Sequence, residues 1–347
     1  SFVGTTGAAM LLIRPLLNTN AERRYRVHTV LFAIFIVANC GGLLTPLGDP
    51  PLFLGFLRGV PFTWTLHLLP EWLFVNAMLL AGYFALDSYY YAQEPAASVR
   101  LDRAEIEPLG LRGAANFVWF AVIIAAVALA PSIDAEAIEH GEAGVMDWVP
   151  LREIIMLGAA LCSYRFGDRH ARFEDNQFEW GPIAEVATLF IGIFLTMIPA
   201  LHYLDEIAAS LPLNEITFFV FTGGLSSVLD NAPTYVTFFE MAGQVPHPGG
   251  ADVAGVPEIY LVSVSLGAVL CGAITYIGNG PNFMVKSVAE ARGVDMPSFG
   301  GYVAKTFVHL VPVLAAMVCL FIAEPLWARA TGAVLAAALL ANDARLI

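Results

Sequence analysis

The sequence has few charged residues and few cysteines, and both shortages restrict what the protein can be. Only 14% of its 347 residues are charged, whereas 58% are hydrophobic. A soluble domain of this composition would expose a large apolar surface to water, so we expect the bilayer to be its solvent. The cysteines lack the paired spacing of a zinc or redox motif, so neither a disulfide nor a metal cluster is expected. They are Cys40, Cys162, Cys271 and Cys319.

Several catalytic and nucleotide-binding motifs are absent from the sequence as well. It has no glycine-rich loop followed by Lys and Ser or Thr, which argues against ATP-driven transport by this chain alone. It has no Ser/His/Asp arrangement at credible spacing and no intramembrane His/Glu cluster, so we expect neither an enzyme nor a cofactor. With 30 acidic and 17 basic residues, the chain is also poorly suited to binding nucleic acid.

Long apolar runs are abundant. Residues 117–131, 183–201, 259–277 and 307–322 carry hardly a charge and approach the length of about 20 residues that spans hydrocarbon as a helix. Membrane-spanning strands would instead show ten-residue segments of alternating polarity, which do not occur here. We therefore predict an all-α, multi-pass integral membrane protein, and we expect it in a bacterial inner membrane.

The distribution of basic residues predicts how these segments are oriented. Residues 134–147, 202–214 and 242–258 contain no Lys or Arg and are expected outside, whereas connections rich in basic residues are expected in the cytoplasm. Residues 215–241 then begin and end outside but are too short for two spans, so we predict a re-entrant hairpin with its tip near 226–234. The basic clusters are Arg23, Arg24 and Arg26; Arg100, Arg103 and Arg112; Arg165, Arg169 and Arg172; and Lys286 with Arg292.

Two apolar segments, 27–57 and 258–289, are each interrupted by Gly and Pro. The interruptions share a pattern, in which Cys40-Gly41 parallels Cys271-Gly272 and, after a one-residue gap, Gly48, Pro51 and Phe53 parallel Gly278, Pro281 and Phe283. Interrupted helices at corresponding places in two oppositely oriented halves are typical of secondary transporters whose site lies at the membrane midplane.

We therefore expect inverted-topology repeats with re-entrant hairpins and broken transmembrane helices. Residues 1–91 would form a first repeat that lacks its N-terminal part, because the chain begins inside an apolar segment. Residues 181–325 would form the second repeat, with connecting helices and cytoplasmic loops at 92–180 and a tail at 326–347.

Polar residues at the interruptions and at the hairpin tip form the candidate site. An ionisable group near mid-bilayer is costly and is by default a functional candidate, which makes Asp230 the strongest residue. With Asn231 it is predicted to hold sodium, supported by the hydroxyls of Ser227 and Thr234. A half-helix N-terminus also attracts anions, so both kinds of ligand stay open. For Asp49, a role in binding and a role in turn formation remain open.

Glu185 is a further candidate, because it lies near the cytoplasmic end of a long apolar helix. A coupling role and a simple interaction with the helix dipole are both open for this residue.

Three segments resemble a known family. Asn-Cys-Gly-Gly-Leu-Leu-Thr-Pro-Leu-Gly-Asp-Pro-Pro at 39–51 resembles a signature of the ion transporter superfamily, and residues 226–234 resemble the hairpin motif of its sodium/proton antiporters. Residues 178–190 are similar to the branch that contains sodium:proton antiporters and citrate transporters. The resemblance implies two hairpins, a site between their tips and the broken helices, elevator-like movement and a homodimer.

The same resemblance assigns the site residues one by one. Thr5 and Thr6 match the first tip, and Asp230, Asn231 and Thr234 match the second. Dicarboxylate carriers of the superfamily have Ser-Asn-Thr at their tips, whereas this chain has Asp-Asn at the second tip and no Asn at the first, which weakens the citrate interpretation. The breaks are matched by Gly48, Asp49, Gly278 and Asn279.

Three functional hypotheses follow. The leading one is sodium/proton antiport by alternating access, in which sodium and protons exchange at Asp230. The second is sodium- or proton-coupled transport of citrate or a dicarboxylate; no basic residue lies at either tip, although Arg14 could serve an anion. The third is a membrane subunit of an ATPase-coupled anion pump.

Overall fold

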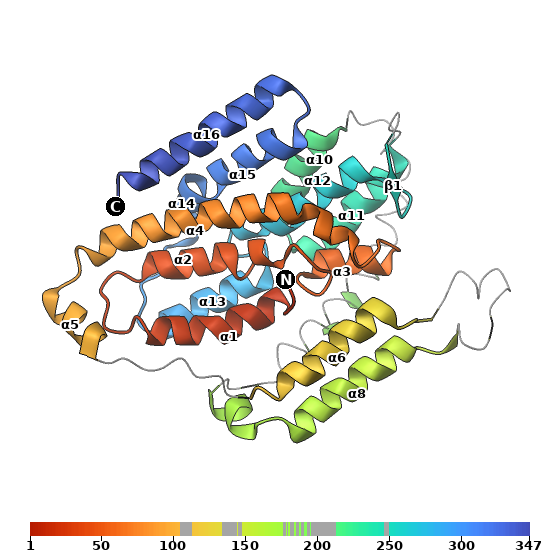
Figure 1. The fold of residues 1–347 in the computed structure, drawn as a ribbon, viewed down its shortest axis with the longest axis horizontal. Coiled ribbons are helices and arrows are strands. Elements are labelled where there is room, and N and C mark those ends of the chain that lie inside the picture. Colours follow the sequence, from red (N-terminus) through yellow and green to blue (C-terminus); the bar gives the residue numbers. More distant parts are fainter. Residues whose placement is uncertain are drawn as a thin grey trace. The chain divides into compact units, whose positions relative to one another are not determined.

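A computed structural model of the chain describes residues 1–104, 113–133, 148–175, 213–245 and 250–347, together with a few single residues between these ranges. Within them, regular structure is helical apart from one small antiparallel sheet, formed by β1 (Asp252–Val253) and β2 (Val256–Pro257) (Figure 1). The all-α prediction is confirmed. The chain forms two compact units, residues 107–188 and the remainder.

The smaller unit is built around two antiparallel helices, α6 (Asn116–Leu129) and α8 (Leu151–Phe166). Ser163 near the end of α8 donates a hydrogen bond to Asn116 at the start of α6, over 3.0 Å. A π-helical turn, η4 (Ala171–Asp175), follows α8.

Two helical stretches in the described residues are long and apolar enough to cross a membrane, and both belong to the larger unit. The first joins η2 (Trp64–Leu68) to α4 (Leu69–Tyr91), and α5 (Ala96–Ala104) follows it. The second is a succession of short elements packed beside α16 (Leu326–Ala344). Its elements are α14 (Phe299–His309), α15 (Val311–Met317) and η7 (Val318–Ile322). The span expected at 182–201 lies largely outside the described residues.

A helical hairpin occupies residues 215–244, as predicted. It consists of α10 (Glu215–Ser226), a tip at 227–230 and α11 (Asn231–Gln244). At 1.5 Å per residue the two arms are about 18 and 21 Å long, which is shorter than a hydrocarbon core of about 30 Å. Neither arm alone could cross a bilayer, so the lengths agree with a re-entrant hairpin, although re-entry itself stays a prediction.

Both predicted helix interruptions are present. In the first half, α1 (Thr5–Asn18) precedes α2 (Val27–Ile36), η1 (Cys40–Gly42) and α3 (Pro50–Leu57), with the break between η1 and α3. In the second half, α12 (Glu258–Cys271) and η6 (Gly272–Ile274) precede α13 (Gly280–Ala291). The arms α1 and α11 each have 14 residues.

The register between the two breaks needs a correction. A Cβ atom added to Gly42 would lie 3.1 Å from the Gly48 carbonyl oxygen, and one added to Gly272 would lie 3.4 Å from the carbonyl oxygen of Gly278. Gly42 therefore corresponds to Gly272, and no gap separates this pair from Gly48 and Gly278. The predicted one-residue gap is wrong. It aligned Cys40 with Cys271, whereas the closely packed glycines of the two breaks correspond without a gap.

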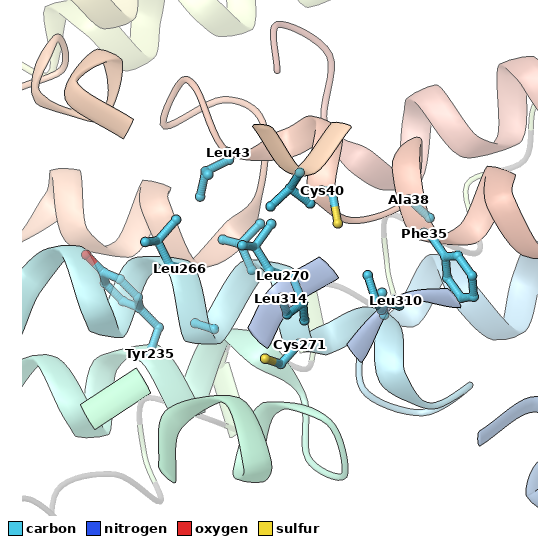
Figure 2. Close-up of a cluster of buried hydrophobic side chains, with 14 of the residues drawn as sticks. Phe35, Ala38, Cys40, Leu43, Tyr235, Leu266, Leu270, Cys271, Leu310 and Leu314 are labelled. Atoms are coloured by element: carbon cyan, nitrogen blue, oxygen red, sulfur yellow. The ribbon is translucent and has the colours of Figure 1, made fainter. Parts of the chain in front are cut away.

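The core of the larger unit forms around α12, whose residues from Ser263 to Cys271 are all buried. A helix buried on every side belongs inside a protein rather than at a lipid-facing surface. Figure 2 shows Leu266 and Leu270 of this helix in one cluster with Cys40 and Leu43 from the first break. The first break is thus packed against the buried core of this unit.

Candidate functional site

Asp49 lies where the first break meets the start of α1, which is the predicted first tip, and the tip of the hairpin at 215–244. Its side chain is 2% exposed, and it occupies the N-cap position of α3 with extended backbone angles. The Thr5 hydroxyl donates to Oδ1 of Asp49 over 2.7 Å, and the Asn231 amide donates to Oδ2 over 2.7 Å. Thr5 begins α1 and Asn231 begins α11, so the starts of three helices converge on one carboxyl group.

The second break lies close to the same carboxyl group. Asn279, the N-cap of α13, interacts with Asp49 through its side chain. The start of a fourth helix therefore approaches the same point. Because helix N-termini carry partial positive charge, this convergence offsets the cost of burying a carboxylate and also suits an added anion.

No basic side chain neutralises Asp49 in the part of the chain that the structure describes. Its side-chain hydrogen-bond partners are all neutral: the hydroxyl of Thr5 and the amides of Asn231 and Asn279. An ionised carboxylate without a counter-charge is costly to bury, even when it is hydrogen-bonded. An ionised Asp49 therefore has no basic side chain as counter-charge, and a bound cation or a proton would neutralise it.

Asn231 has one atom that the protein leaves without a partner. The residue is fully buried, and while its Nδ2 donates to Asp49, its Oδ1 is buried and accepts no hydrogen bond. Such orphan acceptors are rare in folded proteins. Together with the oxygens of Asp49 and Thr5, this amide oxygen belongs to the set of ligands that hard cations prefer.

Asp230 is placed differently from Asp49. It is the N-cap of α11 but makes no capping hydrogen bond with its side chain, and it is only partly buried. Its main-chain carbonyl accepts a hydrogen bond from the Thr234 hydroxyl over 3.0 Å. Its charge is close enough to act on Asp49. Asp230 thus acts on the centre through its charge, whereas Asp49 makes side-chain hydrogen bonds with Thr5 and Asn231.

The remaining candidates at the tips lie near this centre with different contacts. The Ser227 hydroxyl bonds back to the Gly224 carbonyl over 2.7 Å, so it closes the end of α10. Thr6 is partly exposed, and the contact to Asp49 comes from its neighbour Thr5. Glu185 lies outside the described residues.

The two glycines of the breaks have a steric role. A Cβ atom on Gly48 would lie 2.0 Å from the Gly42 carbonyl oxygen, and one on Gly278 would lie 2.6 Å from the Gly272 carbonyl oxygen. No side chain fits at either position. The Gly48 carbonyl also accepts a hydrogen bond from the Thr5 backbone over 2.9 Å, which ties the first tip to its break.

Sequence reasoning missed two threonines that hold the tips. The Thr45 hydroxyl donates to the Ser1 carbonyl, and the Thr275 hydroxyl donates to the Ser227 carbonyl. In the corrected register Thr45 and Thr275 correspond, as do the glycines three residues after each. A threonine at the same place in both breaks was the signal that could have identified them.

One family model matches the chain over residues 1–322, and its description reads "Putative citrate transport". The matched region includes both tips and both breaks. No curated protein matches the chain, and no solved structure matches it.

Proposed function

Because the chain belongs to this citrate transport family and is therefore a secondary transporter and an integral membrane protein, we propose that it carries citrate or a related small carboxylate, coupled to sodium or protons. The observation that supports the proposal best is the Asp49 carboxyl group, held between Thr5 of one tip and Asn231 of the other. A group contacted by both tips is suited to a site whose access must alternate.

The charge of Asp49 explains why binding of the cation and binding of the substrate would be coupled. A cation bound between the oxygens of Asp49, Thr5 and Asn231 would neutralise the centre. The helix N-termini around it could then hold a substrate carboxylate, as half-helix ends do in other transporters. Without the cation, the substrate carboxylate and Asp49 would repel each other strongly in a weakly polar interior. Cation and substrate therefore bind together, and a ligand that favours one conformation shifts the equilibrium between the two.

Sodium/proton antiport is a second candidate, and one observation favours it. No basic side chain pairs with Asp49 among the described residues, so a lone carboxylate anion would find no fixed counter-charge there. A single carboxyl group could instead hold either sodium or a proton. In this alternative the exchange takes place at Asp49, with Asp230 as a second acid close by.

Membrane placement is also part of the proposal. We infer a multi-pass protein of the bacterial inner membrane that functions as a homodimer, with the hairpin at 215–244 entering from the outside. The two long apolar stretches and the short arms of the hairpin support the multi-pass arrangement.

Proteoliposomes containing the full-length protein test both candidates. Labelled citrate is added outside under an inward sodium gradient or an inward proton gradient, and a trapped pH dye reports proton movement. Accumulation of citrate that depends on either gradient, and that is lost in Asp49→Asn, supports carboxylate transport. Proton release upon addition of sodium without citrate accumulation supports antiport. If neither occurs while the reconstituted protein is intact and monodisperse, both candidates fall.

A further inference from the structure

The two tips are fastened to the breaks in different ways. The predicted first tip comprises residues 1–4 and the start of α1, and the second tip comprises residues 227–230 and leads into α11. In each tip, one main-chain carbonyl accepts a hydrogen bond from a buried threonine of the corresponding break, Thr45 for the first tip and Thr275 for the second. The tips differ in the other hydrogen bonds that hold them.

The first tip is joined to the first break at several further points. The Ser1 hydroxyl donates to the Gly41 carbonyl and accepts a hydrogen bond from the Leu44 backbone N–H over 3.2 Å. At the start of α1, the Thr5 backbone N–H donates to the Gly48 carbonyl over 2.9 Å, and the Thr5 hydroxyl donates to the central carboxyl group. The loss of any one of these hydrogen bonds would therefore leave the first tip attached to its break.

The second tip instead bridges the two breaks. At its start the Ser227 carbonyl accepts from Thr275 of the second break, and just after its end the Asn231 amide donates to Asp49 of the first break over 2.7 Å. No other hydrogen bond joins this tip to the second break in the part of the chain that the structure describes. The tip also packs closely on Gly278, where an added Cβ atom would lie 3.0 Å from the Ser227 carbonyl oxygen. A single hydroxyl group thus bonds the second tip to its own break.

The hydroxyl group of Thr275 is fully used. Its oxygen accepts hydrogen bonds from the backbone N–H groups of Ile277 and Gly278, both over 3.1 Å. Because these groups can only donate, the hydroxyl hydrogen is directed to the Ser227 carbonyl. In the first break the main-chain carbonyl of Thr45, and not its hydroxyl, closes the equivalent turn. The Thr275 hydroxyl therefore both shapes the second break and fixes the start of the second tip.

We propose that Thr275 is a positioning residue, whose hydroxyl group holds the second tip on the second break and thereby keeps Asn231 in contact with Asp49. Its counterpart Thr45 is dispensable, because the first tip has other hydrogen bonds to its break. Ser226 at the end of α10 donates to a carbonyl of α12 over 2.6 Å, so this arm stays anchored when the tip is released. The effect on transport rests on the proposed function, whereas the effect on the tip does not.

Hydrogen–deuterium exchange of the purified full-length protein measures the release of each tip. Thr275→Val removes the hydroxyl group from a nearly isosteric side chain, and we expect peptides covering residues 226–232 to exchange about tenfold faster. Thr275→Ser keeps the hydroxyl group and should stay within about twofold of the wild type. Thr45→Val is the matched control, in which peptides covering the first tip should change by less than about threefold.

Two outcomes of the exchange measurement would overturn the proposal. One is an unchanged second tip in Thr275→Val, and the other is an equal increase at the first tip in Thr45→Val. If Thr275→Val does not fold, Thr275→Ala takes its place, because it also lacks the hydroxyl group and introduces no larger side chain. The expected results for the second tip are the same.

Citrate uptake in proteoliposomes shows whether the position of the tip affects the site. Thr275→Val should raise the half-saturating citrate concentration about tenfold, with a maximal rate within about threefold of the wild type, and Thr275→Ser should restore the wild-type value. Thr45→Val should raise this concentration by less than about threefold. A general loss of folded protein would lower the maximal rate instead.

The two measurements separate failure of this inference from failure of the proposed function. Equal rises of the half-saturating concentration in the two valine variants, or no rescue by Thr275→Ser, would count against the positioning role. A wild-type protein that moves neither citrate nor sodium would refute the proposed function, while hydrogen exchange would still decide whether Thr275 holds the second tip.

Discussion

The two interrupted halves of the chain share a backbone but differ in charge. The N-cap of α3, Asp49, has φ −147° and ψ 143°, and the N-cap of α13, Asn279, has φ −149° and ψ 137°. The tips match as closely, since Gly4 before α1 has φ −51° and ψ 143° and Asp230 before α11 has φ −58° and ψ 137°. Corresponding residues thus place four helix N-termini in equivalent positions.

The side chains at these equivalent positions are not equivalent. The first break places a carboxylate at the centre, and the second places the amide of Asn279 beside it. Both tips then bond to the one carboxylate, through Thr5 and Asn231. The duplicated backbone therefore supplies the helix dipoles, while sequence differences between the halves place a carboxylate at the first break and an amide at the second.

Removing the charge from the first half should have the largest effect. Asp49→Asn is expected to reduce cation-coupled transport at least a hundredfold, or about 3 kcal/mol, because a buried charge that organises two hydrogen-bond donors is lost. The introduced amide also turns a donor toward Thr5 or Asn231. The measurement is initial uptake in proteoliposomes at matched protein density.

A swap variant sharpens this first prediction. If the halves were interchangeable, Asp49→Asn combined with Asn279→Asp would restore transport. We expect it to remain below about a tenth of the wild-type rate, because the acceptors at Ala38 and Asn39 repel a carboxylate at 279. Full recovery would show that these two acceptors do not distinguish position 279 from position 49.

Sequence alone identified the elements of this comparison but not its contacts. The interruptions, the hairpin and the helical class follow from local signals, namely Gly and Pro inside apolar runs and segment length. The register failed by one residue because two cysteines offered a closer match than the sterically required glycines. Local sequence patterns show where a helix is interrupted, but packing decides which residues of the two interruptions correspond.

The centre of the site was harder to predict for a related reason. Asp49 lies in Gly-Asp-Pro-Pro, a good turn sequence, so its functional and structural interpretations stayed balanced. Asp230 lacks that alternative and stood out. What sets Asp49 apart from Asp230 is its contacts with Thr5, Asn231 and Asn279, which are distant from it in the sequence. A local sequence pattern cannot predict contacts between distant residues. Sequence reasoning named these residues as candidates but could not predict that their side chains meet.

Adding a side chain at a glycine near the first break should destabilise the protein more than adding one at an uncrowded helix position. A Cβ atom on Gly55 of α3 would lie 2.4 Å from the Tyr235 hydroxyl oxygen of α11. We expect Gly55→Ala to destabilise the protein by about 1–3 kcal/mol, despite the better helix propensity of Ala. The thermal midpoint in detergent measures the loss.

Two further variants separate crowding from other causes. Gly224→Ala in α10 meets nothing within 4 Å and should be neutral or slightly stabilising. Gly55→Ala with Tyr235→Phe should recover part of the loss, because the nearest atom is gone. A double variant no more stable than Gly55→Ala would mean that the hydroxyl is not the obstacle.

Asp230 should matter less than Asp49. It is partly exposed and makes no side-chain capping bond, so Asp230→Asn changes mainly the local field and its action on Asp49. A charge near a helix N-terminus contributes about 0.3–1 kcal/mol, which corresponds to at most about a fivefold change in cation affinity. Sodium titrations of uptake measure it, and a loss as large as that of Asp49→Asn would restore Asp230 as the exchanging group.

The smallest effect is expected for an ion pair between the first break and the arm α11, because the related contact between the second break and α1 lacks such a pair. Arg58 Nε lies 2.8 Å from Glu240 Oε1, joining the end of α3 to α11, and both side chains are partly exposed. In the related contact between α13 and α1, Val288 and Arg14 occupy the corresponding places, so no such pair forms there. Partly exposed pairs contribute at most about 1 kcal/mol, so Arg58→Ala should lower Tm by about 2 °C, and Arg14→Ala should change it less. Equal losses of Tm in the two variants would mean that the ion pair between Arg58 and Glu240 adds no measurable stability. The difference between the two breaks would then lie in the site and not in this contact.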